Sequence, residues 1–511
     1  RVLLIDMVSK IASVIAGSGQ CDINHNDGAS ALSASLCSPT WLGLDGNKNL
    51  LILDSGHQRI RRVLLHKELS NKLTYVPSNG EQISIEKSEN GTFIQKFRNG
   101  NTNFYNTEGY QTSAVDRLGR TTNFQYDPDT KKLTAINHHT GQSSSFSYTG
   151  DKMTSFKDPA NRYTYFNYLG NSLASIKYPD GEFRKFEYDN EGKIIKDTNQ
   201  NGFAVLFDYN TIGRLMSVTD PEGKVTQISD RVTETFETPK REGLGAGKIS
   251  SKLTSANSTE LKLTNDSNGF VRKIKDPLGR ISEVISDFDG KPLKVISPDS
   301  VTLEYKYDEK TKDLLELKNL NTLRKKSQTY NSYGQVTSQT DFNNNTSYNT
   351  YADTTGLLVE VLLPNAVKTN VVYDPNGLPI SKTVYPTNAN YLTTKYAYDD
   401  VGNKTRVTTP DLNFVDYTYD AAGNVLTATN YTNGVAAVTS YTYDLNNRLI
   451  TVTSPKMETT EYTYLPMGEL IQIKDPKSKL TTFEYDRRGL LIRKTNPEGF
   501  VHQFTYDNLG N

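Results

Sequence analysis

The stretch DPKSKLTTFEYDRRGLLIRKT at residues 475–495 decides the fold. Phe483 and Tyr485 are two residues apart, so in a strand both side chains point to one face while Glu484 points to the other. Asp475-Pro476 and Gly489 mark turns, because proline pre-sets φ and glycine tolerates positive φ. The stretch therefore predicts a β-hairpin in which the aromatic face is the buried one.

The same hairpin unit recurs along most of the chain, which holds 31 tyrosines. In most units a glycine stands four residues after the tyrosine, and Asp-Pro-x-Gly forms a second turn signal. One hairpin is unstable alone and buries its aromatic face only by pairing with neighbours, while a long sheet twists and curls. The sequence therefore predicts a repeat array that forms one long antiparallel sheet. The aligned tyrosines are Tyr126, Tyr148, Tyr168, Tyr188, Tyr209, Tyr307, Tyr330, Tyr351, Tyr373, Tyr398, Tyr419, Tyr443, Tyr464, Tyr485 and Tyr506.

Composition excludes several classes of partner. Lys+Arg and Asp+Glu both number 58, so the chain lacks the basic footprint of a nucleic-acid binder. No window approaches the roughly 18 consecutive apolar residues of a membrane helix, so we expect no membrane insertion by this chain. Two cysteines in 511 residues form neither a disulfide-dense scaffold nor a Cys-x-x-Cys metal site.

The repeat motif resembles the YD (RHS) repeat. The segments YDAAGNVL at 419–426 and DYNTIGRL at 208–215 are similar to its consensus, and the resemblance covers about residues 80–511. Members of this family wind their hairpins into a spiral that closes as a hollow shell. The expected fold class is therefore all-β, with antiparallel hairpins spiralling into a YD shell over residues 66–511.

The first 65 residues follow a different pattern. Segments 11–19, 36–45 and 49–63 together resemble one blade of an NHL propeller, although His57-Gln58 stands where that family has Asn-His. Arg1 to Asp6 resemble the end of the preceding blade. The resemblance implies a partial β-propeller over residues 1–65, and we expect the chain to be a fragment at both ends, since it also stops inside a repeat.

The repeat cadence breaks at about residues 227–262. Tyrosine is absent from 210 to 304, and a glycine-rich run lies at 243–247. One interpretation is a degenerate repeat with a longer turn, and the other is a plug or lid that crosses the shell. The glycine run lacks the Gly-Lys-Ser/Thr spacing of a phosphate loop.

Catalytic signals are weak, so we predict no catalytic, cofactor-binding or metal-binding residues and no enzyme activity. The pair His138-His139 sits beside a polar turn and is expected to be solvated. Asp374-Pro375-Asn376-Gly377-Leu378 resembles part of the self-cleavage signature of bacterial relatives, but ordinary repeat spacing after Tyr373 favours a structural turn. Cys21 and Cys37 could pair, and spacing leaves this open. The six histidines are His25, His57, His66, His138, His139 and His502.

Two functional classes remain. Bacterial YD proteins of this architecture enclose their own C-terminal effector, often a toxin, until delivery. An NHL segment followed by a YD shell is also the order in teneurins, which are cell-surface adhesion and signalling proteins. Residues 90–122 resemble the start of an RHS array and favour the container. A third alternative is binding of a cell-surface protein or glycan, and all three imply a secreted or cell-surface location.

Overall fold

The fold is known from a computed structural model, which divides the chain into two compact units, Arg1–Thr74 and Tyr75–Asn511. Every regular element in the described residues is a β-strand, and those residues include no helix long and apolar enough to cross a membrane. The described residues are 2–5, 12–16, 36, 39–44, 50–54, 59–63, 83–229, 232–235, 248–254, 260–265, 270–287, 290–387, 390–507 and 510.

The first unit holds two small antiparallel sheets, one of β1 and β2 and one in the order β3-β4-β5. Ala16, Leu36, Leu50 and Ile52 form its buried core, with Val63 packed against them. The propeller assignment stays a prediction, and Cys21, Cys37, His25, His57 and His66 lie outside the described residues. The strands are β1 (Val2–Ile5), β2 (Ala12–Ala16), β3 (Pro39–Leu44), β4 (Leu50–Asp54) and β5 (Arg59–Val63).

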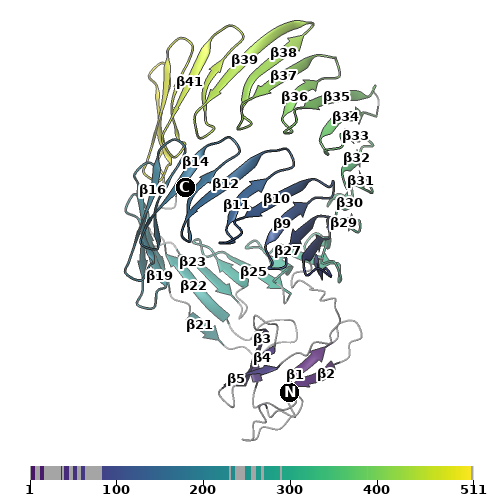
Figure 1. The fold of residues 1–511 in the computed structure, drawn as a ribbon, viewed down its shortest axis with the longest axis vertical. Coiled ribbons are helices and arrows are strands. Elements are labelled where there is room, and N and C mark those ends of the chain that lie inside the picture. The colour runs from purple at the N-terminus through teal and green to yellow at the C-terminus, as the bar shows by residue number, and fades with distance from the viewer. Residues whose placement is uncertain are drawn as a thin grey trace. The chain divides into compact units, whose positions relative to one another are not determined.

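The second unit is one continuous antiparallel sheet in which each hairpin pairs with the next along the chain (Figure 1). No pairing among the described strands joins β45 to β6, so the sheet has two ends. Its first strands are β6 (Ile83–Lys87), β7 (Phe93–Phe97), β8 (Thr102–Tyr105), β9 (Gln111–Val115), β10 (Thr121–Tyr126), β11 (Leu133–Asn137), β12 (Ser143–Thr149), β13 (Lys152–Lys157), β14 (Tyr163–Leu169), β15 (Ser172–Lys177), β16 (Phe183–Tyr188), β17 (Ile194–Thr198), β18 (Ala204–Tyr209), β19 (Leu215–Thr219) and β20 (Val225–Ile228).

The remaining strands continue the same order to the end of the described chain. They are β21 (Val232–Thr235), β22 (Lys248–Thr254), β23 (Glu260–Asn265), β24 (Val271–Lys275), β25 (Ile281–Ser286), β26 (Pro292–Ile296), β27 (Thr302–Tyr307), β28 (Leu314–Asn319), β29 (Lys325–Tyr330), β30 (Val336–Thr340), β31 (Thr346–Tyr351), β32 (Leu358–Leu362), β33 (Lys368–Tyr373), β34 (Pro379–Tyr385), β35 (Leu392–Tyr398), β36 (Lys404–Thr408), β37 (Phe414–Tyr419), β38 (Val425–Thr432), β39 (Val435–Tyr443), β40 (Leu449–Thr453), β41 (Thr459–Tyr464), β42 (Leu470–Lys474), β43 (Leu480–Tyr485), β44 (Leu491–Thr495) and β45 (Val501–Gln503).

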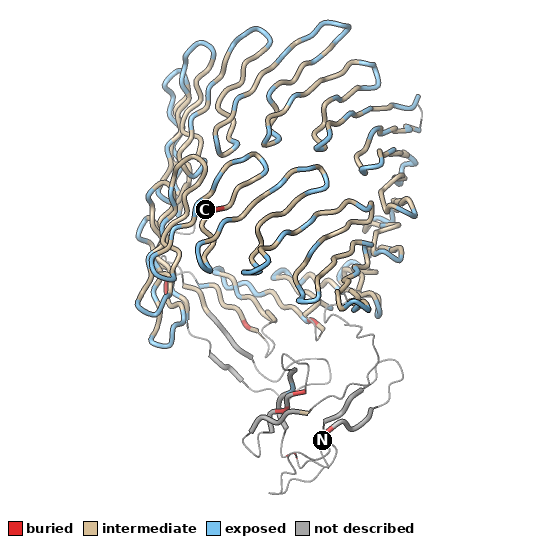
Figure 2. The backbone as a smooth tube through the Cα atoms, viewed as in Figure 1, coloured by how far each residue is buried: buried red, intermediate tan, exposed pale blue. Residues whose placement is uncertain are grey.

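The β43–β44 hairpin confirms the predicted assignment of strand faces. Phe483 pairs with Lys494 and Glu484 with Arg493, and the Glu484 carboxylate lies 3.3 Å from the Arg493 guanidinium on the face opposite the rings. The expectation of a buried aromatic face is wrong in degree, because Phe483 and Tyr485 are only half-buried. Most of the second unit is half-buried or exposed (Figure 2), as a single layer of strands requires.

The repeated tyrosine has a structural role that its spacing did not reveal. A β-bulge lies immediately before Tyr485, and its hydroxyl donates to the Leu470 carbonyl of the preceding strand at 2.9 Å. Burial raises the pKa of this phenol. The tyrosine therefore ties each hairpin to the one before it. Equivalent bonds are made by Tyr188, Tyr209, Tyr307, Tyr330, Tyr351, Tyr373, Tyr398, Tyr419, Tyr464 and Tyr506.

The interrupted segment keeps its strands in the sheet. β20 and β21 pair with successive parts of β22, and β22 pairs with β23. The bulge that elsewhere precedes tyrosine recurs before Asn265 and Ser286. The hairpin unit thus persists with polar residues at the tyrosine position, while residues 236–247, which include the glycine run, lie outside the described residues.

Each tyrosine is followed by a tight turn organised by the next residue. At Asp189 the backbone N–H donates to the Lys193 carbonyl at 2.9 Å, and Oδ1 accepts the Glu191 and Lys193 N–H groups. Gly192 adopts φ +83°, the left-handed conformation that this turn requires. Hydrogen bonds from the Lys193 side chain and backbone lower the pKa of Asp189. This recurring geometry explains the spacing of Asp and Gly after tyrosine.

Candidate functional site at the seam between two coils

The sheet winds so that early and late hairpins meet turn to turn. We call β6–β20 the first coil and β27–β45 the second coil; in Figure 1 strands β36–β41 of the second coil lie above β10–β14 of the first. Turns directly after the repeated tyrosine are the YD turns, and those at the opposite edge are the return turns. Return turns of the first coil contact YD turns of the second, and we call this contact line the seam.

Seam contacts join residues that are 215 to 285 positions apart in the sequence. This separation corresponds to about one revolution of the coil. Side chains on the first coil bind backbone groups and polar side chains on the second. The pairs are Arg117 with the Asp353 and Thr354 carbonyls, Arg120 with the Asn376 carbonyl, Arg162 with the Leu445 carbonyl and Asn447, Asp180 with Asn446, Asn201 with Glu469 and the Met467 N–H, and Glu222 with the Arg487 N–H.

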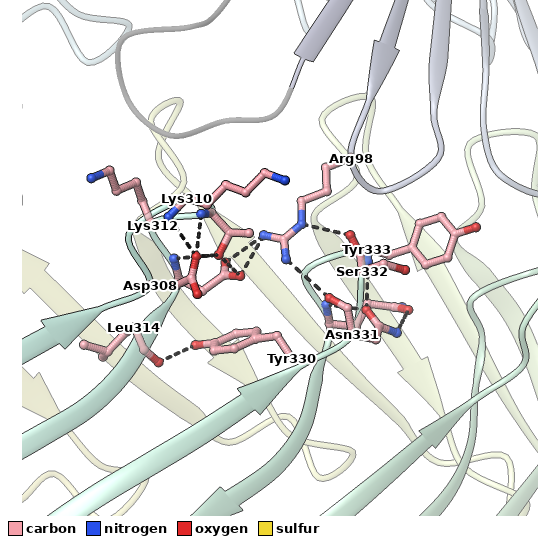
Figure 3. Close-up of polar contacts among 12 residues, drawn as sticks. Arg98, Asp308, Lys310, Lys312, Leu314, Tyr330, Asn331, Ser332 and Tyr333 are labelled. Atoms are coloured by element: carbon pink, nitrogen blue, oxygen red, sulfur yellow. Dashed lines mark hydrogen bonds and ion pairs between the residues drawn. The ribbon is translucent and has the colours of Figure 1, made fainter. Parts of the chain in front are cut away.

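Arg98 anchors the start of the seam (Figure 3). Its Nη1 lies 2.8 Å from Oδ2 of Asp313, and Nε and Nη2 donate to the carbonyls of Ser332 and Asn331 at 3.1 and 3.3 Å. The two charged side chains are only 16% and 18% exposed. A half-buried Tyr330 lies beside the ion pair and donates to the Leu314 carbonyl at 2.9 Å. This ion pair is shielded far more than the exposed pairs on the strand faces.

A second arginine reinforces the anchor. The Arg117 guanidinium carbon lies 3.6 Å from the ring centroid of Tyr333, a cation–π distance, while Nη2 donates to the Asp353 carbonyl at 2.6 Å. Gly356 leaves the space that this side chain occupies, since a Cβ there would overlap Nη1 of Arg117. The two coils are therefore fitted to one another at this turn.

Replacing Gly356 with alanine should lower the free energy of unfolding by about 2 kcal/mol, because the new Cβ strains a residue at φ +70° and displaces Arg117. Gly192→Ala is the matched control, since φ is +83° there and no atom lies within 4 Å of the place that an alanine Cβ would take. That control should cost about 1 kcal/mol. Urea denaturation measures both variants. Equal losses of unfolding free energy would show that the seam contact at Gly356 contributes nothing to stability.

Replacing Arg98 with alanine should cost about 2 kcal/mol, because the Asp313 carboxylate loses a shielded partner and two carbonyls lose a donor. Lys96→Ala is the control, because the Lys96–Glu86 pair lies within the first coil and its side chains are half exposed. The control should change stability by less than about 0.5 kcal/mol. Urea denaturation measures the free energy of unfolding of both variants. Comparable losses of stability in the two would contradict the special role of Arg98.

Two pockets lie along the seam and are lined by both coils. One of about 440 Å³ is bordered by Gln142 and Pro159 of the first coil and by second-coil residues that include Asp399 and Tyr417. Another of about 520 Å³ places Arg162 and Asp180 near Arg448. Asp420 borders both pockets, and hydrogen bonds from Asn424 outweigh the effect of partial burial and lower its pKa. These carboxylates serve as turn acceptors, a structural role.

The histidine pair forms part of another small pocket, of about 240 Å³, beside Asp116 and Arg120. His138 and His139 are exposed, their ring centroids lie 4.1 Å apart, and His138 Nδ1 contacts the Thr140 hydroxyl. Slight desolvation and the neighbouring His138 lower the pKa of the exposed His139. Within the described ranges no group of three or more His, Cys, Asp or Glu residues could hold a metal ion. The absence of metal and catalytic residues stays a prediction.

Asp374 occupies an ordinary YD turn at the seam. Its Oδ1 accepts the Leu378 N–H at 2.8 Å, and the Gly377 N–H donates to the Asp374 carbonyl at 3.0 Å. The following Asn376 carbonyl receives Arg120 from the first coil. This segment therefore forms a turn and a coil contact, and its structural role remains a prediction.

Sequence reasoning missed the seam residues. Arg98, Arg117, Arg162, Asn201 and Glu222 all lie in return turns, at positions where the turn itself needs no particular side chain. Long polar residues at the tips of one turn class were the available signal. Many of their partners are backbone groups of distant turns, which carry no sequence signature.

An antiparallel hairpin repeat that coils until its two turn classes meet defines this protein as a YD-repeat shell. The sequence matches the family described as Teneurin YD-shell over residues 89–276 and 276–511. The chain therefore belongs to that family. Comparison with curated proteins gives no match.

Several solved structures resemble the chain at low sequence identity. The TcdB2-TccC3-TEV crystal structure has a TM-score of 0.49 and 13% identity, covering 88% of this chain and 30% of that one. The Photorhabdus luminescens Tc holotoxin pore has a TM-score of 0.44 and 13% identity, with 88% and 29% coverage. TcdB2-TccC3 without its hypervariable C-terminal region has a TM-score of 0.44 and 12% identity, with 91% and 26% coverage. The chain thus spans about 30% of the first of these structures.

Proposed function

We propose that this chain is a non-enzymatic wall segment of a secreted or cell-surface container that encloses its own C-terminal polypeptide effector. The observation that carries the proposal is the seam, where side chains of the first coil meet backbone groups of the second. A closed wall needs contacts between successive coils of the sheet, whereas an extended repeat array needs contacts only between sequence neighbours. The first 65 residues are assigned to an NHL-type propeller segment of the same protein.

The chemistry of the seam suits a passive wall. Arginine donors satisfy carbonyls at the turn tips, so the described contacts hold two coils together without a nucleophile or a metal. The Arg98–Asp313 pair is shielded, and such pairs lose much of their stabilisation when one partner is removed. Removing several arginines should therefore loosen the wall while the hairpin ladder stays paired.

Limited proteolysis of the intact natural polypeptide tests enclosure. We expect a segment beyond this chain to resist protease under native conditions and to become cleavable when Arg98, Arg117 and Arg162 are all replaced by alanine. Lys96→Ala, on the exposed strand face, is the control and should leave protection unchanged. Cleavage of every segment in the unaltered protein at the rate of the unfolded control would contradict the container.

The family description favours a second candidate, an adhesion and signalling ectodomain of the teneurin type. In that role the shell would present a surface to a cell-surface protein or glycan instead of holding an effector. Display of the intact protein on cells, followed by aggregation assays, separates the two. Cell adhesion without a protease-protected internal segment would support the second candidate.

A further inference from the structure

One region of the sheet face opposite the repeated tyrosines combines lysines that have no carboxylate across the strands with exposed aromatic rings. At several places on this face, lysine or arginine forms an ion pair with a carboxylate on an adjacent strand. Such pairs join Glu187 to Lys196, Glu283 to Lys273, Glu316 to Lys325, Glu360 to Lys368, Glu461 to Lys474 and Glu484 to Arg493.

On β13–β16 three lysines face no carboxylate across the strands. Lys157 pairs with Ser145 and Tyr163, Lys177 with Tyr165 and Phe183, and Lys185 with Ser175 and Thr198. Adjacent strands are about 4.8 Å apart, so the first two ammonium groups start from strands roughly 10 Å apart. Glu187, two residues after Lys185 on the same face, pairs with Lys196, so these three lysines have no carboxylate directly across the strands.

Aromatic rings stand between these lysines and are exposed. Tyr163, Tyr165 and Phe183 are 41%, 44% and 38% exposed, and the Tyr163 and Tyr165 rings are stacked at 5.8 Å with an interplanar angle of 12°. Lys157 lies 5.8 Å from the Tyr163 centroid and Lys177 lies 5.7 Å from that of Phe183. We call Lys157, Tyr163, Tyr165, Lys177, Phe183 and Lys185 the basic aromatic patch.

The side chains next to the patch are serines, which project little from the sheet. Ser155, which pairs with Tyr165, is 8% exposed, and Ser147 lies on its other side. Small hydroxyl residues next to standing rings leave lateral access to the ring faces. A ligand can therefore reach both the ring surfaces and the ammonium groups without displacing a long side chain.

We propose that the basic aromatic patch binds an acidic polypeptide segment that carries aromatic or aliphatic side chains between its carboxylates. The carboxylates supply the charges that are missing across the strands, and the apolar side chains cover the exposed rings. A polypeptide fits better than a nucleic acid because the chain balances 58 basic with 58 acidic residues and the patch contains no arginine. The inference is independent of the enclosing role.

Fluorescence anisotropy with a labelled random copolymer of glutamate and tyrosine tests the proposal. We expect the 511-residue chain to bind this probe more tightly than polyglutamate, oligothymidylate or heparin. Joint replacement Lys157→Gln, Lys177→Gln and Lys185→Gln should weaken binding about tenfold, as three exposed charge pairs of about 0.5 kcal/mol each imply. Tyr165→Ser should weaken binding of the copolymer but not that of polyglutamate.

The matched control replaces Lys196, Lys325 and Lys474, which have carboxylate partners, with glutamine. It changes net charge equally and should leave binding of the copolymer within about twofold. Thermal unfolding verifies that each variant folds. Absence of copolymer binding, equal weakening in both lysine variants, or tighter binding of oligothymidylate or heparin would overturn the proposal.

Discussion

Replacing Tyr485 with alanine should lower the free energy of unfolding by about 3 kcal/mol, measured by urea denaturation. The loss combines the packing of a half-buried ring with the hydrogen bond from the Tyr485 hydroxyl to the Leu470 carbonyl at 2.9 Å. Tyr485→Phe isolates the second contribution and should cost about 1 kcal/mol, since only the hydroxyl is removed.

Glu484→Ala is the internal control for this prediction. Glu484 is exposed on the opposite face and its carboxylate lies 3.3 Å from Arg493, so its removal should cost less than about 0.5 kcal/mol. Equal losses for Tyr485→Ala and Glu484→Ala would contradict the assignment of strand faces. If Tyr485→Phe leaves the free energy of unfolding unchanged, the hydroxyl does not link successive hairpins.

Acidification should begin to destabilise the protein below about pH 5 and do so most steeply below about pH 4. The turn aspartates accept backbone N–H groups, and their pKa values are lowered in the folded state. At Asp308 the main cause is the Thr311 N–H; at Asp444 partial burial opposes ionisation, but hydrogen bonds from Arg448 outweigh it. The turn aspartates with a lowered pKa are Asp116, Asp127, Asp189, Asp276, Asp308, Asp341, Asp420, Asp444 and Asp486.

The sign of this effect follows from proton linkage. A carboxylate whose folded pKa lies below its unfolded value of about 3.9 stabilises the protein above that value and loses this contribution as pH falls through the folded pKa. Because many such turns lose this contribution together, the free energy of unfolding should fall steeply on acidification. Urea midpoints as a function of pH test it, and Asp308→Asn should flatten the curve slightly. A midpoint that stays constant or rises on acidification would refute this account of the turns.

The hairpin repeat could be predicted from sequence because its determinants are local. Phe483 and Tyr485 define a face through their spacing, and Asp486 with Gly489 defines the turn within four residues. The half-buried state of the rings could not be predicted from the strand pattern. A single-layer sheet and a β-sandwich share that pattern and differ only in whether a second layer covers the rings. The persistence of the unit at Ser286 was also missed, because serine replaces the tyrosine used for alignment.

The seam could not be predicted because it depends on how many hairpins complete one revolution. Arg98 and Asp313 are separated by 215 residues, and their juxtaposition follows from the accumulated curvature of the intervening strands. Sequence alone also provides no reason to distinguish Lys157 from Lys196. Both are strand lysines, and only the register shows that Glu187 faces Lys196 whereas Tyr163 faces Lys157.

Disulfide trapping across the seam tests the central claim most directly, namely that the two coils meet turn to turn. Asn201 Oδ1 accepts the Met467 N–H at 3.1 Å, so Asn201→Cys with Met467→Cys, in a background with Cys21→Ser and Cys37→Ser, should form a disulfide on mild oxidation. Asn171, in a YD turn of the first coil, provides the control pair with Met467 and should remain unlinked. Mass spectrometry of peptides that shows no 201–467 disulfide, or equal linkage in both pairs, would contradict the coiled wall.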